Sequence, residues 1–231
     1  MPVLYVNGDS HSAGAEAVND HAFIMDRDPS VQYENRWAPD PENLKYCYGK
    51  VLADLLGYDI VNQSRSAGSN DRIIRVTNEY LENNRPDIVV IGWSTWEREE
   101  WFAEGEWWQI NASGVGHDWP EEIKQKYKEY VINLNWETKA IDAHNKIVAL
   151  HYKLLNLKIP HLFFNTCSTF NYYRTLRQID WGDNYIRPYD KWSYQSYLDD
   201  LGFSKSKWNH FRADGHKKWA EFLLPYIKVL L

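Results

Sequence analysis

The seven residues 86–92, Pro-Asp-Ile-Val-Val-Ile-Gly, constrain the fold more than any other stretch of this 231-residue chain. Residues 88–91 are all β-branched, and an apolar run without polar alternation is typical of a strand buried on both faces. Strands of that kind belong to parallel sheets that helices cover on each side. The stretch therefore predicts an α/β protein with this strand near the centre of its sheet.

Other short apolar runs predict three more strands, at residues 3–6, 58–62 and 160–167. Apolar residues at helical spacing predict helices over 44–56, from Ser69 or Asn70 to Leu81, over 121–155 with a break near residues 133–135, and from about Gly215 onward. Segments 19–44 and 168–200 are expected to be long loops, the first with a short helix and the second rich in aromatic residues. The alternation predicts a three-layer α/β/α sandwich with a mostly parallel central sheet, formed by residues 1–231 as a single domain.

Composition narrows the function classes. The formal net charge of −6 and the lack of a long basic run argue against a nucleic-acid partner. No apolar run is long enough for a transmembrane helix, and no signal peptide is visible, so we expect no membrane association and a cytoplasmic protein. Cys47 and Cys167 lack metal-ligand spacing and are expected to be reduced core residues. His144 and His151 share a helix face, but nothing completes a metal site, so we expect structural histidines and no metal.

Residues 7–14, Asn-Gly-Asp-Ser-His-Ser-Ala-Gly, follow the first predicted strand. Open α/β sheets bind ligands beyond the carboxyl ends of their strands, where Ser10 would lie. A helix beginning there would also offer unpaired N–H groups to an anion. Gly68 and Asn70 occupy a second strand–helix junction at the same edge, where a turn glycine and a helix cap are the alternative interpretation.

These residues resemble the blocks of the SGNH (GDSL-type) hydrolase family, and the resemblance extends along the whole chain. Residues 7–14 resemble block I, whose serine is the nucleophile, and Gly68 matches the block II glycine that donates an oxyanion N–H. His210 is followed by Gly215 and His216 at the family's offsets for its catalytic histidine. The resemblance implies a flavodoxin-like fold and serine ester hydrolysis, with Ser10 as nucleophile, His210 as base, and no cofactor. The alternative register makes His216 the base.

The chain departs from the family pattern twice. Block III, Gly-x-Asn-Asp in the family, reads Gly-Trp-Ser-Thr at residues 92–95, so Ser94 or Asn70 would have to provide the side-chain oxyanion donor. The family's aspartate three residues before the histidine is Lys207 here. The acid that orients His210 is therefore missing or lies elsewhere; the aspartates considered for that role are Asp199, Asp200 and Asp214.

The sequence is also rich in tryptophan, with 12 in total. Four of them lie at residues 101–120, within an expected insertion at about residues 95–135. This insertion is either a lid with a carbohydrate-stacking surface or a loop that packs its own aromatic residues. Arg98, at its start, either holds a substrate or forms a surface ion pair.

The sequence predicts an esterase or acetylesterase for a small acyl ester, with an O-acetylated carbohydrate as the specific substrate class. Two alternatives stay open: an inactive member of the same fold that binds a glycan or a protein, and an O-acyltransferase. The Gly-Trp-Ser of residues 92–94 resembles phage-encoded relatives, which leaves open a place in a phage particle. The oligomeric state is not predicted.

Overall fold

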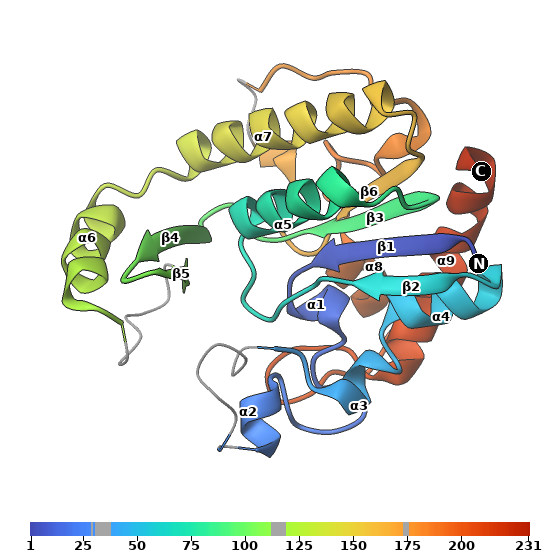
Figure 1. The fold of residues 1–231 in the computed structure, drawn as a ribbon, viewed down its shortest axis with the longest axis horizontal. Helices are drawn as coiled ribbons and strands as arrows, with labels where there is room; N and C mark the ends of the chain where they lie inside the picture. Colours follow the sequence, from blue (N-terminus) through green and yellow to red (C-terminus); the bar gives the residue numbers. More distant parts are fainter. Residues whose placement is uncertain (29, 31–37, 112–118, 173–175) are drawn as a thin grey trace.

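Four parallel strands form the central sheet of the computed structural model of this protein (Figure 1). They are β1 (Val3–Gly8), β2 (Asp59–Asn62), β3 (Ile88–Trp93) and β6 (His161–Asn165), in the order β2-β1-β3-β6. The structure describes the chain except for residues 29, 31–37, 112–118 and 173–175. All six residues of β3 are buried between two neighbouring strands, as expected for the β-branched run of residues 88–91.

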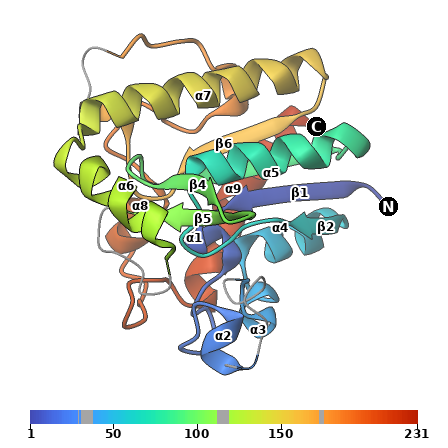
Figure 2. The same ribbon diagram turned by 60° about the vertical axis from the view of Figure 1, so that its left-hand side comes forward.

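Helices cover both faces of the sheet, which confirms the predicted three-layer α/β/α architecture (Figures 1 and 2). One face packs against α5 (Asn70–Asn83) and α7 (Trp136–Asn156), and the other against α4 (Tyr48–Leu56), α8 (Tyr194–Asp200) and α9 (Ala213–Leu230). Alternate side chains of each strand enter the two cores. Val90 faces α4, α8 and α9, for example, whereas Val89 and Ile91 face α5 and α7.

The predicted helices form close to their expected bounds. Ser69 caps α5 by accepting a hydrogen bond from the N–H of Arg72, and α4 ends at Gly57 in a left-handed conformation. The break expected near residues 133–135 separates α6 (Glu121–Ile132) from α7. The helix expected over 44–56 is shorter than predicted: α4 begins at Tyr48 after its capping residue Cys47, and Leu44 is the last residue of the separate helix α3. The remaining short helices are α1 (Ser10–Ala13), α2 (Ile24–Arg27), α3 (Pro41–Leu44), η2 (Phe170–Tyr172) and η3 (Gly182–Asn184).

The sequence did not predict the antiparallel hairpin of β4 (Glu99–Ala103) and β5 (Glu106–Ile110), which lies beyond the carboxyl ends of the strands (Figure 1). Trp101 and Trp108 from the hairpin pack with Trp119 and with residues of α6 in a separate buried cluster. These three tryptophans therefore fill a small core of their own, whereas Trp107 is 44% exposed. Residues 112–118 of the expected insertion, and residues 29 and 31–37 of the expected first loop, lie outside the described part of the chain.

The two histidines of the shared helix face pack into the protein interior. His144 contacts the hydroxyl of Tyr189 at 2.9 Å, and His151 Nδ1 lies 2.8 Å from Nε2 of His161 on β6. Cys47 and Cys167 are both free thiols. None of the described helices combines the length and the apolar character needed to cross a bilayer.

Candidate functional site

Ser10 is the first residue of α1, directly after β1 and the capping residue Asp9. The chain can turn this sharply because Gly8 and Gly92 have no side chains. A Cβ on either glycine would lie within 2.7 Å of Ser12 Oγ. As the first residue of a helix, Ser10 has an N–H without a partner in its own helix. The turn therefore holds the Ser10 hydroxyl at the carboxyl edge of the sheet, together with a backbone donor.

His210 lies on the loop before α9, and its Nε2 is 2.9 Å from Ser10 Oγ. The loop is fixed by a bridge between Lys205 and Phe211 that flanks the histidine. His216, the alternative base, lies inside α9 with its ring against Tyr48. The structure thus places His210, and not His216, beside Ser10.

The other nitrogen of His210, Nδ1, forms a hydrogen bond with Oε2 of Glu16. Glu16 is fully buried and follows α1 on the loop behind the serine. Two of the aspartates suggested by the sequence have other partners. Asp199 pairs with Lys205, and Asp214 accepts a hydrogen bond from the Gly215 N–H. Sequence patterns near His210 do not indicate Glu16, because it lies 194 positions away along the chain.

Two of the three residues expected to stabilise an oxyanion, Gly68 and Asn70, already donate hydrogen bonds within the protein. The Gly68 N–H donates to the carbonyl of Arg65 at 2.9 Å. The Asn70 amide accepts from the Ser94 N–H at 2.9 Å and donates to the Ser94 carbonyl at 3.2 Å. Asn70 thus ties α5 to the end of β3. An oxyanion role for Gly68, Asn70 and Ser94 stays a prediction, and for Gly68 and Asn70 it requires the donor to exchange its partner.

Arg98 joins the end of β3 to the serine turn. Its guanidinium donates to Ser94 Oγ at 2.9 Å and lies 3.5 Å from Asp9 Oδ2, which also accepts from the Thr166 hydroxyl. The Arg98 side chain is 23% exposed and the Asp9 side chain 1%. A surface ion pair is therefore the wrong description, because Arg98 neutralises a buried carboxylate directly beside Ser10.

A second histidine, His11, lies beside His210 with ring centroids 5.1 Å apart. Burial lowers the pKa of His11 to about 4, although the nearby Asp9 opposes this shift. Its Nε2 is 3.2 Å from the side-chain nitrogen of Gln195, and an amide nitrogen only donates, so the proton of neutral His11 is on Nδ1. His11 is neutral at pH 7 and does not repel a proton arriving on His210.

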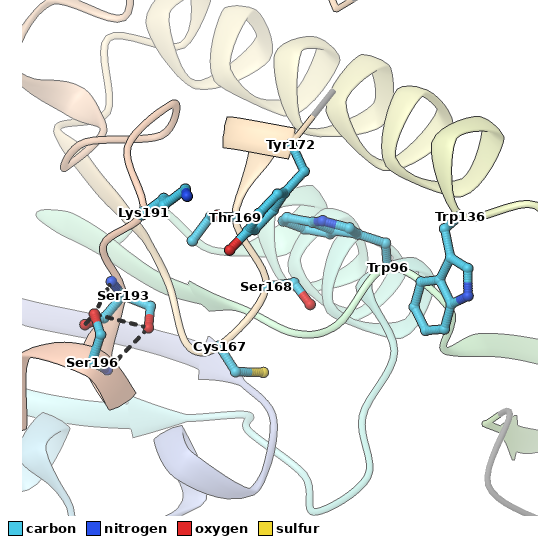
Figure 3. Close-up of a pocket in the computed structure, with 9 residues that line it drawn as sticks. All are labelled: Trp96, Trp136, Cys167, Ser168, Thr169, Tyr172, Lys191, Ser193 and Ser196. Carbon is cyan, nitrogen blue, oxygen red and sulfur yellow. Dashed lines mark hydrogen bonds between the residues drawn. The ribbon is translucent and has the colours of Figure 1, made fainter. Parts of the chain in front are cut away.

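A pocket of about 400 Å³ lies where the chain leaves β6 and enters α8 (Figure 3). The pocket adjoins the site through two chain neighbours of its lining residues. Thr166, which precedes the lining residue Cys167, donates to Asp9, and Gln195, which precedes the lining residue Ser196, contacts His11. Aromatic rings, hydroxyls, one thiol and one ammonium group line it; these residues are Trp96, Trp136, Cys167, Ser168, Thr169, Tyr172, Lys191, Ser193 and Ser196. The Trp96 ring stacks on the Phe170 ring, with the two ring centroids 4.4 Å apart. No group of three or more potential metal ligands gathers in the described parts of the chain.

Several solved structures are similar in outline. An acetyl xylan esterase (Est2A) from Butyrivibrio proteoclasticus is 13% identical, with a TM-score of 0.46 over 99% of this chain and 64% of that chain. A carbohydrate esterase family 2 enzyme from Corynascus thermopiles is 14% identical, with a TM-score of 0.46 over 100% of this chain and 66% of that chain. The esterase EstA from Pseudoalteromonas sp. is 11% identical, with a TM-score of 0.42 over 100% and 96%. At these identities and TM-scores the similarity does not transfer a function.

A comparison with curated proteins gave no significant match. One family model matches residues 33–157, more than half of the chain, and its description is a family of unknown function, DUF6071. The matched segment contains Gly68, Asn70 and Ser94, whereas Ser10, Glu16 and His210 lie outside it. The chain belongs to the DUF6071 family.

Proposed function

We propose that this protein is a serine ester hydrolase of SGNH type that acts on a small acyl ester. The observation that carries the proposal is the 2.9 Å contact between Ser10 Oγ and His210 Nε2, at the carboxyl edge of a parallel sheet. A serine hydroxyl is a weak nucleophile unless a base within hydrogen-bond reach accepts its proton. His210 lies within that reach, and the hydrogen bond at its other nitrogen fixes its tautomer.

In the proposed reaction, Ser10 Oγ attacks the ester carbonyl while its proton moves to His210 Nε2. The tetrahedral intermediate collapses, and His210 gives that proton to the leaving alcohol, which leaves an acyl group on Ser10. Water then attacks the acyl carbonyl with His210 again as the base, and the acid and free Ser10 are released.

The oxyanion of each tetrahedral intermediate needs hydrogen-bond donors. The Ser10 N–H supports this role directly, because it begins α1. Gly68 and Asn70 are the further donors that we propose, after they exchange the partners they have in the free protein. One well-placed donor contributes roughly 3 to 4 kcal/mol to the transition state.

The neighbouring pocket favours an O-acetylated carbohydrate as the substrate. Trp136 is 48% exposed and Tyr172 is 69% exposed, so apolar ring faces are available beside the hydroxyls of Ser168 and Thr169. A sugar offers apolar C–H faces and hydroxyls together, and binding pockets commonly combine aromatic walls with a few polar groups. We expect Trp136→Ala to raise KM for an acetylated sugar and to leave kcat within about twofold, as for loss of uniform binding.

The function is tested by hydrolysis of p-nitrophenyl acetate and by labelling with a fluorophosphonate. We expect Ser10→Ala and His210→Ala each to lower kcat by at least about 10³-fold. Ser12→Ala is the matched serine control, because Ser12 lies in the same helix and its hydroxyl accepts a hydrogen bond from the Tyr48 hydroxyl at 2.8 Å, away from His210. Wild type and Ser12→Ala should hydrolyse and label. Equal labelling of wild type and Ser10→Ala would refute the proposal.

A catalytically inactive binding protein is the second candidate. The observation that favours it is the engagement of Gly68 and Asn70, the two expected donors, in bonds to the protein itself. This candidate predicts no labelling of Ser10 by the fluorophosphonate, together with binding of unmodified glycans to the pocket. An O-acyltransferase would share the acyl-serine step, and an added sugar acceptor would then speed the loss of acyl-enzyme.

A further inference from the structure

We propose that Glu16 is the carboxylate that orients His210, so that the acid of the triad comes from the loop behind the nucleophile and not from the histidine loop. This inference rests on the proposed function. It makes Glu16 a positioning residue that acts on the ester through His210. Sequence reasoning about the stretch around His210 cannot find it, because residues 16 and 210 are 194 positions apart.

The contacts of His210 define a single tautomer. Nδ1 faces a carboxylate oxygen, which only accepts hydrogen bonds, so Nδ1 carries the proton of the neutral ring. The lone pair of Nε2 is then free to accept the Ser10 hydroxyl proton. When His210 becomes an imidazolium, its positive charge lies against the Glu16 carboxylate, which stabilises that state.

The Glu16 carboxylate is itself held in place. The Ser206 hydroxyl donates to Glu16 Oε2 at 2.7 Å, and the same hydroxyl oxygen accepts from the His210 N–H at 3.1 Å. Ser206 therefore connects the acid to the backbone of the histidine that it orients. Glu16 Oε1 is buried and has no hydrogen-bond partner in the described part of the chain.

The backbone of Glu16 is strained in a way that favours a functional role. Its φ of 59° lies in the left-handed region, which costs a residue other than glycine roughly 1 to 2 kcal/mol. Such conformations persist where surrounding contacts impose them. Here the Arg212 guanidinium donates to the Glu16 carbonyl at 2.7 Å, and the Ala213 N–H donates to the Ala17 carbonyl at 3.0 Å. The segment that carries His210 thus clamps the segment that carries Glu16.

The charge environment points the same way. Glu16 is fully buried, and within the described residues the basic group that pairs with its carboxylate is His210, which is charged only when protonated. Arg212 uses one guanidinium nitrogen for the carbonyls of Glu16 and Asn19 and the other for Asp20, which is exposed. A buried carboxylate is costly without a partner charge, and the imidazolium of the reaction supplies that charge.

The test compares Glu16→Gln and Glu16→Asp with Asp214→Asn, a matched carboxylate-to-amide control near the same loop. We expect Glu16→Gln to lower kcat for p-nitrophenyl acetate by about 10²- to 10⁴-fold and to change KM by less than about threefold. Glu16→Asp keeps the charge and should recover part of the rate, and Asp214→Asn should match wild type.

A second readout does not depend on turnover. In ¹⁵N-histidine NMR spectra, neutral His210 of wild type should show the Nδ1–H tautomer. Glu16→Gln should show a share of the Nε2–H tautomer, because an amide can donate as well as accept. If Ser10→Ala and His210→Ala abolish hydrolysis but Glu16→Gln keeps the wild-type rate and the wild-type His210 tautomer, Glu16 is not the orienting acid and the hydrolase proposal stands. If wild type neither hydrolyses nor labels while the His210 tautomer still changes in Glu16→Gln, the function fails and the Glu16–His210 coupling stands. A Glu16→Gln variant with lowered stability but an unchanged His210 tautomer would reduce Glu16 to a structural residue.

Discussion

The buried histidine pair between β6 and α7 should make the fold sensitive to mild acid. His161 Nδ1 contacts the carbonyl of Ile159 at 3.1 Å and therefore carries the proton, so Nε2 accepts from His151 Nδ1. A proton added to Nε2 would face the N–H of His151 in the buried core. Burial accordingly lowers the pKa of His161 to about 4, with a further contribution from His151.

The sign and size of the effect follow from linkage. An unfolded histidine has a pKa of about 6.5, so between that value and about 4 the unfolded chain binds more protons than the native protein. The free energy of unfolding therefore falls as the pH falls through this window. Titration of His161 alone lowers it by about 2 kcal/mol between pH 7.5 and pH 5.

The perturbation that isolates this effect is His161→Gln, because a glutamine oxygen can accept from His151 but does not titrate. Urea unfolding at pH 7.5 and pH 5, followed by tryptophan fluorescence, gives the free energy for each protein. Wild type should lose about 2 kcal/mol more than His161→Gln between the two pH values. The control is Leu154→Val in the same core. Its free energy of unfolding should be about 1 kcal/mol below that of wild type at both pH values, because the substitution changes packing and no titratable group. Parallel losses for wild type and His161→Gln, within about 0.5 kcal/mol, would refute the reasoning.

Substitutions at three further positions test how the site is built, each by urea unfolding. Gly92→Ala places a Cβ 2.7 Å from Ser12 Oγ, so it should lower the free energy of unfolding by about 1 to 3 kcal/mol and slow fluorophosphonate labelling. Unchanged labelling would contradict the tight packing behind the serine turn. Ser69→Ala removes the cap of α5 and should cost about 1 kcal/mol, whereas Ser69→Gly should cost only a few tenths. Gly14→Ala combines a φ of 71° with a Cβ 2.7 Å from that of Cys47 and should cost more than about 2 kcal/mol; a neutral result would refute the left-handed turn.

The sequence alone determined most of the architecture. The β-branched run of residues 88–91 predicted a strand buried on both faces, and β3 lies in the interior of a parallel sheet. The spacing of apolar residues predicted the main helices, because periodicity reports which face of an element is buried. The hairpin of β4 and β5 was missed, since its short, charged strands pair with each other and lie apart from the main sheet.

The sequence predicted only some residues of the candidate site. Ser10 and His210 occur in recognisable local patterns, and the fold places them 2.9 Å apart. Glu16 lies in no such pattern. Only the tertiary structure decides which distant carboxylate meets Nδ1 of His210, because that contact depends on how the loop after α1 packs against the loop before α9. Local sequence specifies which elements form, whereas contacts across nearly the whole chain length arise only once those elements have packed.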